Sequence, residues 1–162
     1  MKPISAIVIA IIIFSYTAHS QDSLLHSNSP QDKPWMPKDS SEYVKFLRFR
    51  EVFTTLAKKK YPSVKARFLK GLPQGEILDI VTILKDSVGS SEQVFVTVQE
   101  ISDGMVKGII SSEILNVAGY HRGDKYSFPE EELLDWSITK PDGSEEGNLI
   151  GKFIDRIQQN QK

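Results

Sequence analysis

Three apolar segments between residues 76 and 112 alternate with the period of a β-strand and are separated by short polar links. Residues 76–85 are rich in Ile, Leu and Val, and residues 92–101 carry Val-Phe-Val-Thr-Val with alternating faces. The third segment, 105–112, follows the tight turn Ser102-Asp103-Gly104. No link between these segments is long enough for the helix that a parallel crossover needs. The pattern therefore predicts an antiparallel sheet.

The residues before the sheet predict an amphipathic helix over 39–60. Asp39 and Glu42 have the spacing of a capping box, in which the first side chain accepts a hydrogen bond from the first turn and the second reaches back. With about 100° per residue, one broad arc of this helix is apolar and is expected to face the sheet. The arc contains Tyr43, Phe46, Leu47, Phe49, Phe53, Leu56 and Ala57.

Pro62 is well placed to begin a second, short helix that Gly71 closes. A strand over residues 64–70 is the competing prediction. The three lysines at positions 58–60 then lie in the last turn of the first helix, where the helix dipole favours cations. A patch for an anionic partner is the alternative interpretation of the same run.

Further signals complete the fold prediction. Residues 125–128 predict another strand, 129–132 a single helical turn, and 154–159 a short helix. We predict an α+β fold in which the amphipathic helix and the short second helix pack on a twisted antiparallel sheet of about five or six strands. Partial closure into a small barrel is compatible with this pattern.

Residues 1–20 have the pattern of a signal peptide. Lys2 precedes a nearly unbroken apolar run, 4–16, and small residues precede a predicted cleavage between Ser20 and Gln21. A retained membrane anchor is the alternative, but thirteen apolar residues fall short of the roughly 20 that a spanning helix needs. We expect a periplasmic or secreted bacterial protein with no stable membrane anchor after cleavage. The polar, proline-rich residues 21–38 are expected to form a flexible tether.

Composition excludes several kinds of partner and site. The formal net charge is −1, which gives no support for nucleic acid as a partner. The chain has no cysteine, so neither a zinc site of the usual ligand type nor a Cys/His catalytic pair can form. Stability outside the cytoplasm cannot depend on disulfides either. We predict no cofactor and no metal.

The stretch 135–153 combines a tryptophan, turn signals and four carboxylates. Positions 142–147 place oxygen ligands and a glycine as in a calcium loop, but Phe153 stands where such a loop has its final Glu. A hairpin turn at Pro141-Asp142-Gly143 explains the same residues.

Asp135 with Glu145 or Glu146 is the pair of carboxylates best suited to general acid–base catalysis in this chain. That chemistry requires both carboxyl groups in one cleft, with separated pKa values. The structural interpretation is that Asp135 accepts backbone N–H bonds at a chain reversal while Trp136 fills the core. Asp135, Trp136 and Asn148 are also candidates for shaping a binding surface.

In order and spacing, residues across the second half of the chain resemble the domain of unknown function 2314 (YegJ-like) family. The resemblance covers about 61–155, which leaves 156–162 as a C-terminal tail. Asp135-Trp136 followed by Gly147-Asn148-x-x-Gly151 is its most specific element. The other matching residues are Glu92, Gln93, Val94, Phe95, Val96, Gly104, Gly108, Gly123, Asp124, Phe128, Glu146, Lys152 and Phe153. The resemblance implies an exported bacterial protein and, because the family has no established activity, transfers no catalytic residue.

The sequence predicts an exported, non-enzymatic binding module with an unknown protein partner in the cell envelope. The partner would contact an exposed strand edge or the corner formed by Trp136 and Asn148. The alternative is a periplasmic hydrolase in which Asp135 and Glu146 act as acid and base.

Overall fold

The computed structural model describes residues 39–159. The predicted signal peptide, its cleavage site at Ser20 and Gln21, and the predicted tether at 21–38 lie outside the described residues. The last three positions of the predicted tail, 160–162, lie outside them as well.

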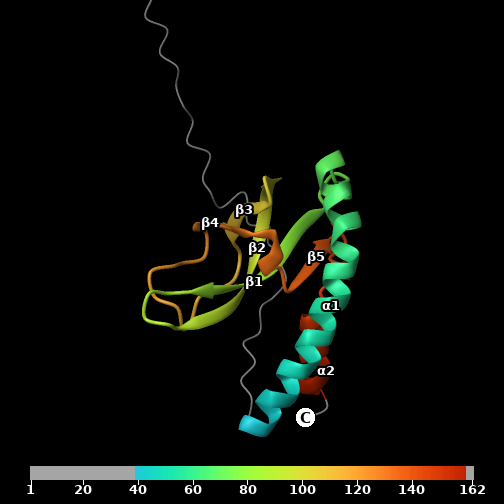
Figure 1. Ribbon diagram of the computed structural model, residues 1–162. Coiled ribbons are helices and arrows are strands. Elements are labelled where there is room, and N and C mark those ends of the chain that lie inside the picture. The colour runs from blue at the N-terminus through green and yellow to red at the C-terminus, as the bar shows by residue number, and fades with distance from the viewer. Residues whose placement is uncertain (1–38, 160–162) are drawn as a thin grey trace, which may run out of the picture.

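Two helices pack on a six-stranded antiparallel sheet (Figure 1). Along the chain the elements are α1 (Ser40–Lys70), β1 (Ile77–Lys85), β2 (Ser91–Ser102), β3 (Met105–Ile110), β4 (Lys125–Pro129), a 3-10 turn (Glu130–Glu132), β5 (Asp135–Thr139), β6 (Glu145–Gly147) and α2 (Leu149–Gln159). The α+β class, the antiparallel sheet and the helical turn after β4 are therefore confirmed.

The sheet is open, with spatial order β4-β3-β2-β1-β5-β6. Strands β1 to β4 form a meander, after which the chain returns so that β5 pairs with the other side of β1. The short strand β6 pairs with β5 and forms one edge, and β4 forms the other. The predicted partial closure into a barrel is wrong, because the two edge strands do not pair with each other.

Alternation along the central strands gives the sheet two different faces. Leu78 and Ile80 of β1 lie with Trp136 and Ile138 of β5 on the face that packs against α1. The main hydrophobic core on this face includes Ala57, Tyr61, Val64, Leu84, Val94, Val96, Ile101, Val106, Ile110, Phe128 and Leu133. Asp79, Val81, Asp135 and Ser137 alternate with these residues and therefore point to the second face.

The first helix does not end at residue 60. It runs through Pro62 to Lys70, so the predicted pair of helices, 39–60 and a short second one, is wrong. A proline inside a helix costs about 3 kcal/mol. Tyr61 and Val64 on either side of Pro62 are both buried against the sheet, and such burial contributes roughly 1.5–3 kcal/mol per side chain. Packing therefore outweighs the local signal, whereas the predicted caps at Asp39 and Gly71 are confirmed.

The continuous helix also changes the position of the lysine run. Residues 58–60 lie in the middle of α1 and not in a last turn, so the helix dipole does not explain them. Lys58 donates to the backbone oxygen of Glu131 at 2.7 Å, while Lys59 and Lys60 are exposed.

The N-terminal half of α1 extends past the sheet, and α2 lies beside it (Figure 1). The rings of Phe49 and Phe53 contact Phe153 of α2, with centroids 4.8 Å and 5.3 Å apart. Phe46 and Ala57 are buried as predicted, but Tyr43, Phe49 and Leu56 remain about half exposed. The predicted apolar arc therefore faces the protein interior only in part.

The second helix begins at Leu149, five residues before the predicted start at 154, and includes positions assigned to the tail. Among residues 39–159, neither helix is long and apolar enough to cross a membrane.

Candidate functional site

Asp135, the first residue of β5, is completely buried and holds the start of α2. Its Oδ2 accepts a hydrogen bond from the backbone N–H of Ile150 at 2.8 Å, and its Oδ1 accepts from the backbone N–H of Trp136 at 2.8 Å. Burial raises the pKa of the Asp135 carboxyl, and these backbone N–H groups act in the opposite direction. A carboxylate at the N-terminus of a helix satisfies N–H groups that have no partner within the helix. This position explains why α2 starts earlier than its own sequence predicts.

Trp136 points to the opposite face and holds α1. Its side chain is 3% exposed, and its Nε1 donates to the backbone oxygen of Ala57 at 3.2 Å. On β6, Gly147 lies against the indole ring, where an added Cβ would come within 2.7 Å of Trp136 Cε3. Trp136 therefore does not form part of the surface, and a binding role for it as an exposed anchor is not supported by its position.

Asn148 joins β6 to α2 in a left-handed backbone conformation, with φ of 51°. Its backbone N–H donates to the oxygen of Trp136 at 2.7 Å, and its Nδ2 donates to Glu145 Oε2 at 2.8 Å. Asparagine adopts this conformation more readily than most residues. The side chain is buried, so it fixes a chain reversal instead of presenting an amide to solvent.

Glu146 lies on the α1 face of the sheet, because it pairs with Ile138 in the β5–β6 register. Its carboxylate oxygens accept two hydrogen bonds from Arg67 Nη1, at 2.9 Å and 2.8 Å. Asp135 points to the other face. Asp135 and Glu146 are therefore separated by the sheet, and each has a structural partner of its own. Glu145, the other predicted partner of Asp135, pairs with Thr139 and lies on the same face as Asp135, where it accepts a hydrogen bond from Asn148.

The turn before β6 likewise has a structural explanation. Asp142 Oδ1 accepts from the backbone N–H of Ser144 at 2.9 Å, as Asp commonly does in tight turns. In the part of the chain that the structure describes, no three His, Asp or Glu side chains gather where they could hold a metal ion.

One polar cluster was not anticipated from the sequence. Asp79, in the middle of β1, is completely buried on the second face of the sheet. Its Oδ1 accepts hydrogen bonds from Thr97 Oγ1 at 2.6 Å and from Ser111 Oγ at 3.3 Å, and its Oδ2 has no partner. Burial raises the pKa of Asp79 to about 6, and the nearby charge of Glu145 contributes in the same direction. The only available signal was a single acid in the apolar run of residues 77–84.

Two hydroxyl groups share this face. Ser137 lies directly opposite Asp79 in the register, and Thr139 follows two residues later on the same strand. Both side chains are buried, and neither hydroxyl oxygen has a hydrogen-bond partner. Buried polar groups without a partner reduce stability, so these two hydroxyl groups carry a cost in the folded state.

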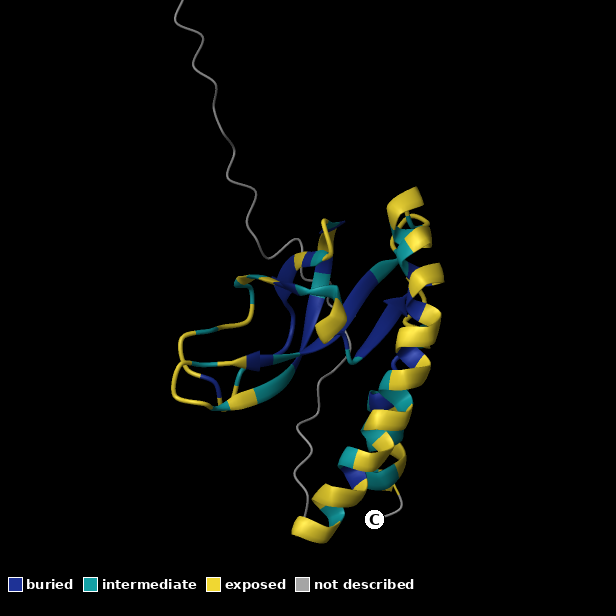
Figure 2. Ribbon diagram, in the orientation of Figure 1, coloured by how far each residue is buried: buried dark blue, intermediate teal, exposed yellow. Residues whose placement is uncertain are grey.

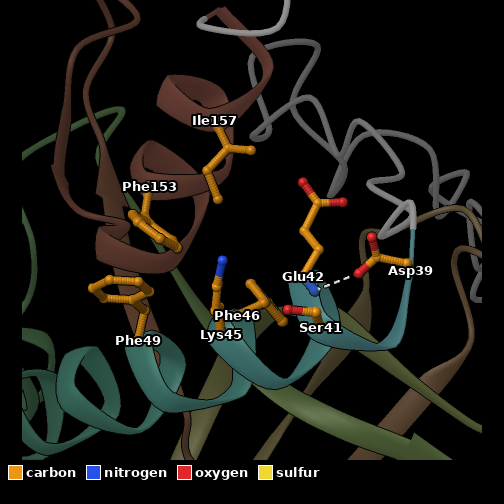
Figure 3. A pocket seen from close by; sticks show the side chains of 8 residues that line it. All are labelled: Asp39, Ser41, Glu42, Lys45, Phe46, Phe49, Phe153 and Ile157. Atoms are coloured by element: carbon orange, nitrogen blue, oxygen red, sulfur yellow. Dashed lines mark hydrogen bonds between the residues drawn. The ribbon is translucent and has the colours of Figure 1, made fainter.

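The outer surface of α1 is the second unanticipated feature. Exposed apolar side chains follow one another along its N-terminal half, and Figure 2 shows the exposed residues that run along this helix. Between the first turns of α1 and the side of α2 lies a groove of about 420 Å³, lined in part by Lys45, Phe49, Phe153 and Ile157 (Figure 3). Apolar surface of this kind on a monomer is a common mark of an interaction site.

Comparisons with protein-family models, with curated proteins and with solved structures found no match to this chain. The resemblance to the YegJ-like family therefore stays a prediction.

Proposed function

We propose that this protein is a non-enzymatic, exported binding module that holds a protein partner through the outer surface of α1. The observation that carries the proposal is that three of the five exposed large apolar side chains before Ala57 lie together on one side of this helix. Phe49, Val52 and Leu56 are 48%, 55% and 45% exposed. Covering the exposed half of each would contribute roughly 1 kcal/mol, which a partner can supply.

The position of these residues supports an interface with another molecule, because the protein itself, within residues 39–159, has no uncovered surface for them to pack against. The sheet face under α1 is already filled by buried residues, and α2 covers one side of the N-terminal half of the helix. Phe49 and Val52 precede Ala57, the first residue of α1 in the main core, and Leu56 adjoins it, so these side chains lie where α1 leaves the sheet (Figure 1). A helix that presents apolar residues on a rigid scaffold is a recurrent mode of protein recognition.

Export remains part of the proposal on the pattern of residues 1–20 alone. That pattern favours a periplasmic or secreted location and, with it, a partner in the cell envelope. The hydrolase alternative receives no support from Asp135 and Glu146, because the register places them on opposite faces of the sheet.

Affinity capture from periplasmic extract tests the proposal. The chain from Gln21 to Lys162 is used as bait, together with Val52→Asp and a matched control, Val88→Asp. Val88 is 83% exposed in the loop between β1 and β2, so its substitution introduces the same charge at a distant apolar position. We expect a stoichiometric partner that Val88→Asp retains and Val52→Asp loses, with unchanged melting temperatures. A partner lost equally by both variants, or retained by both, would contradict the assignment of this surface.

A further inference from the structure

Five of the exposed residues of α1 follow the spacing of a coiled-coil seam. Lys45, Phe49, Val52, Leu56 and Lys59 are separated by four, three, four and three residues, and all five are exposed. This alternation is the 3.5-residue repeat with which one helix packs along another. Nothing in the packing of α1 on the sheet requires it, because the residues that contact the sheet, Ala57, Tyr61 and Val64, lie on a different side of the helix.

Basic residues surround the apolar centre of this seam. With about 100° per residue, Arg48 and Lys60 fall within the same arc of roughly 120° as the five seam residues. Arg48 and Lys60 are both exposed. Glu51, the one acid between positions 45 and 60, points well outside the arc. The surface thus combines three apolar side chains with four bases: Lys45, Arg48, Lys59 and Lys60.

This surface could bind a second copy of the chain, an anionic membrane or a helix of another protein, and the charge pattern favours the last. A second copy of the chain would bring like charges together in either helix direction, which costs affinity. An anionic membrane usually binds helices with a broad apolar face, whereas this seam is narrow and its apolar side chains are half covered. A helix with acidic flanks matches both the spacing and the charge.

We propose that the surface of α1 binds a single amphipathic helix of a partner protein, whose apolar residues follow the same heptad spacing and are flanked by Asp or Glu. The helix would lie along α1 over two heptads, from Lys45 to Lys59, a length of about 21 Å. This inference rests on the proposed function and adds the chemistry of the partner to it.

Two synthetic peptides test the inference by fluorescence anisotropy. Both are 21-residue helices with Leu at the a and d positions; one has Glu at every e and g position, and the other has Lys. We expect the chain from Gln21 to bind the Glu peptide at least tenfold more tightly than the Lys peptide, with affinity that falls as salt is raised. Val52→Asp should weaken binding of the Glu peptide at least tenfold, and Val88→Asp should leave it unchanged.

A charge reversal provides the decisive control. The double variant Lys59→Glu, Lys60→Glu changes two exposed positions and should reduce the preference for the Glu peptide or reverse it. Equal affinity for both peptides, or none for either, would overturn the inference. Binding of the chain to phosphatidylglycerol vesicles that Val52→Asp abolishes, or dimerisation in sedimentation that Val52→Asp abolishes, would overturn it in favour of a membrane or a second copy. Capture of a partner that depends on Val52 but lacks an acidic helix would refute this inference alone and leave the proposed function standing.

Discussion

Asp79 is a carboxylic acid that the fold buries completely in the middle of β1. Its pKa is about 6 instead of the ordinary 3.8, chiefly because burial disfavours the charged form. The folded chain therefore binds this proton more tightly than the unfolded chain. The contribution of Asp79 to stability is greatest below about pH 4, decreases as the pH rises from about 4 to about 6, and stays low above that range. A difference of about two pKa units corresponds to about 3 kcal/mol.

Asp79→Asn replaces the group with a neutral side chain of similar shape. We expect the variant to be more stable than the wild type at pH 7 and similar to it at pH 4, with a change in the difference of up to about 3 kcal/mol. Urea unfolding at pH 4, 5, 6 and 7 measures this difference, and other titrating groups cancel because both proteins contain them. Parallel stability curves for the two proteins would show that Asp79 does not titrate in this range.

Gly147 has two separate reasons to be glycine, and one variant pair distinguishes them. Its φ is 82°, and an added Cβ would meet both the backbone oxygen and the indole ring of Trp136. Gly143 has nearly the same φ, 81°, but nothing within 4 Å of an added Cβ. Gly143→Ala should lose about 1–2 kcal/mol from the left-handed conformation alone. Gly147→Ala should lose roughly 1–3 kcal/mol more from overpacking against Trp136. Equal losses in thermal unfolding would mean that the close contact with Trp136 is unimportant.

At the residue scale, the sequence predicts which strand residues point to opposite faces of the sheet. It does not predict which residues pack against each face. Asp135 and Trp136 were expected at a chain reversal with the tryptophan in the core, and the structure shows both features. That Asp135 and Glu146 face opposite ways depends on the β5–β6 register, which local patterns do not determine. The burial of Asp79 depends on strands distant in sequence and was missed for the same reason.

At the level of elements, α1 shows where local signals fail. Pro62 is a residue type that commonly begins a helix, and the residues before it are enough to form a separate helix of ordinary length. The helix continues because Ala57, Tyr61, Val64 and Phe68 form one uninterrupted stripe that packs on the core. Tertiary burial thus determines the length of the helix, and the sequence alone could locate only its two caps.

Pro62→Ala tests this explanation. Pro62 is exposed inside a continuous helix, so alanine should stabilise the protein by about 1–3 kcal/mol through recovery of helix propensity and a backbone hydrogen bond. Ser63→Ala, at the neighbouring exposed position, controls for the general gain from alanine and should change stability by less than about 1 kcal/mol. If Pro62 instead began a separate helix, its replacement would be neutral or unfavourable, and chemical denaturation would show no gain.

At the scale of the whole molecule, the stretch 135–153 connects three layers of the structure. Trp136 holds α1 on one face, Asp135 holds the start of α2, and Phe153 of α2 contacts the extended half of α1. The return of β5 to the centre of the sheet makes this arrangement possible. No local pattern predicts that β5 pairs with β1, because the pairing joins strands that are separated by three others along the chain.

Asp135→Asn is expected to loosen this connection selectively. An amide can accept only one of the two hydrogen bonds that the carboxylate oxygens now accept, and its NH2 group would face a backbone N–H at the other position. We expect a loss of roughly 1.5–3 kcal/mol in stability, the usual contribution of a hydrogen bond to a charged group. Hydrogen exchange should show faster opening of the α2 amides while the amides of β1 and β2 remain protected.

The same variant decides between the structural and the catalytic interpretation of Asp135. Asp142→Asn serves as the control, because its carboxylate accepts a backbone hydrogen bond in an exposed turn and touches neither helix. If α2 opens only in Asp135→Asn, the residue acts by fixing that helix, and the surface that α2 and α1 form together depends on it. Binding of the Glu peptide to α1 should then weaken in Asp135→Asn, even though Asp135 is buried and cannot touch the peptide. Full stability with loss of a biological activity would instead restore the catalytic hypothesis.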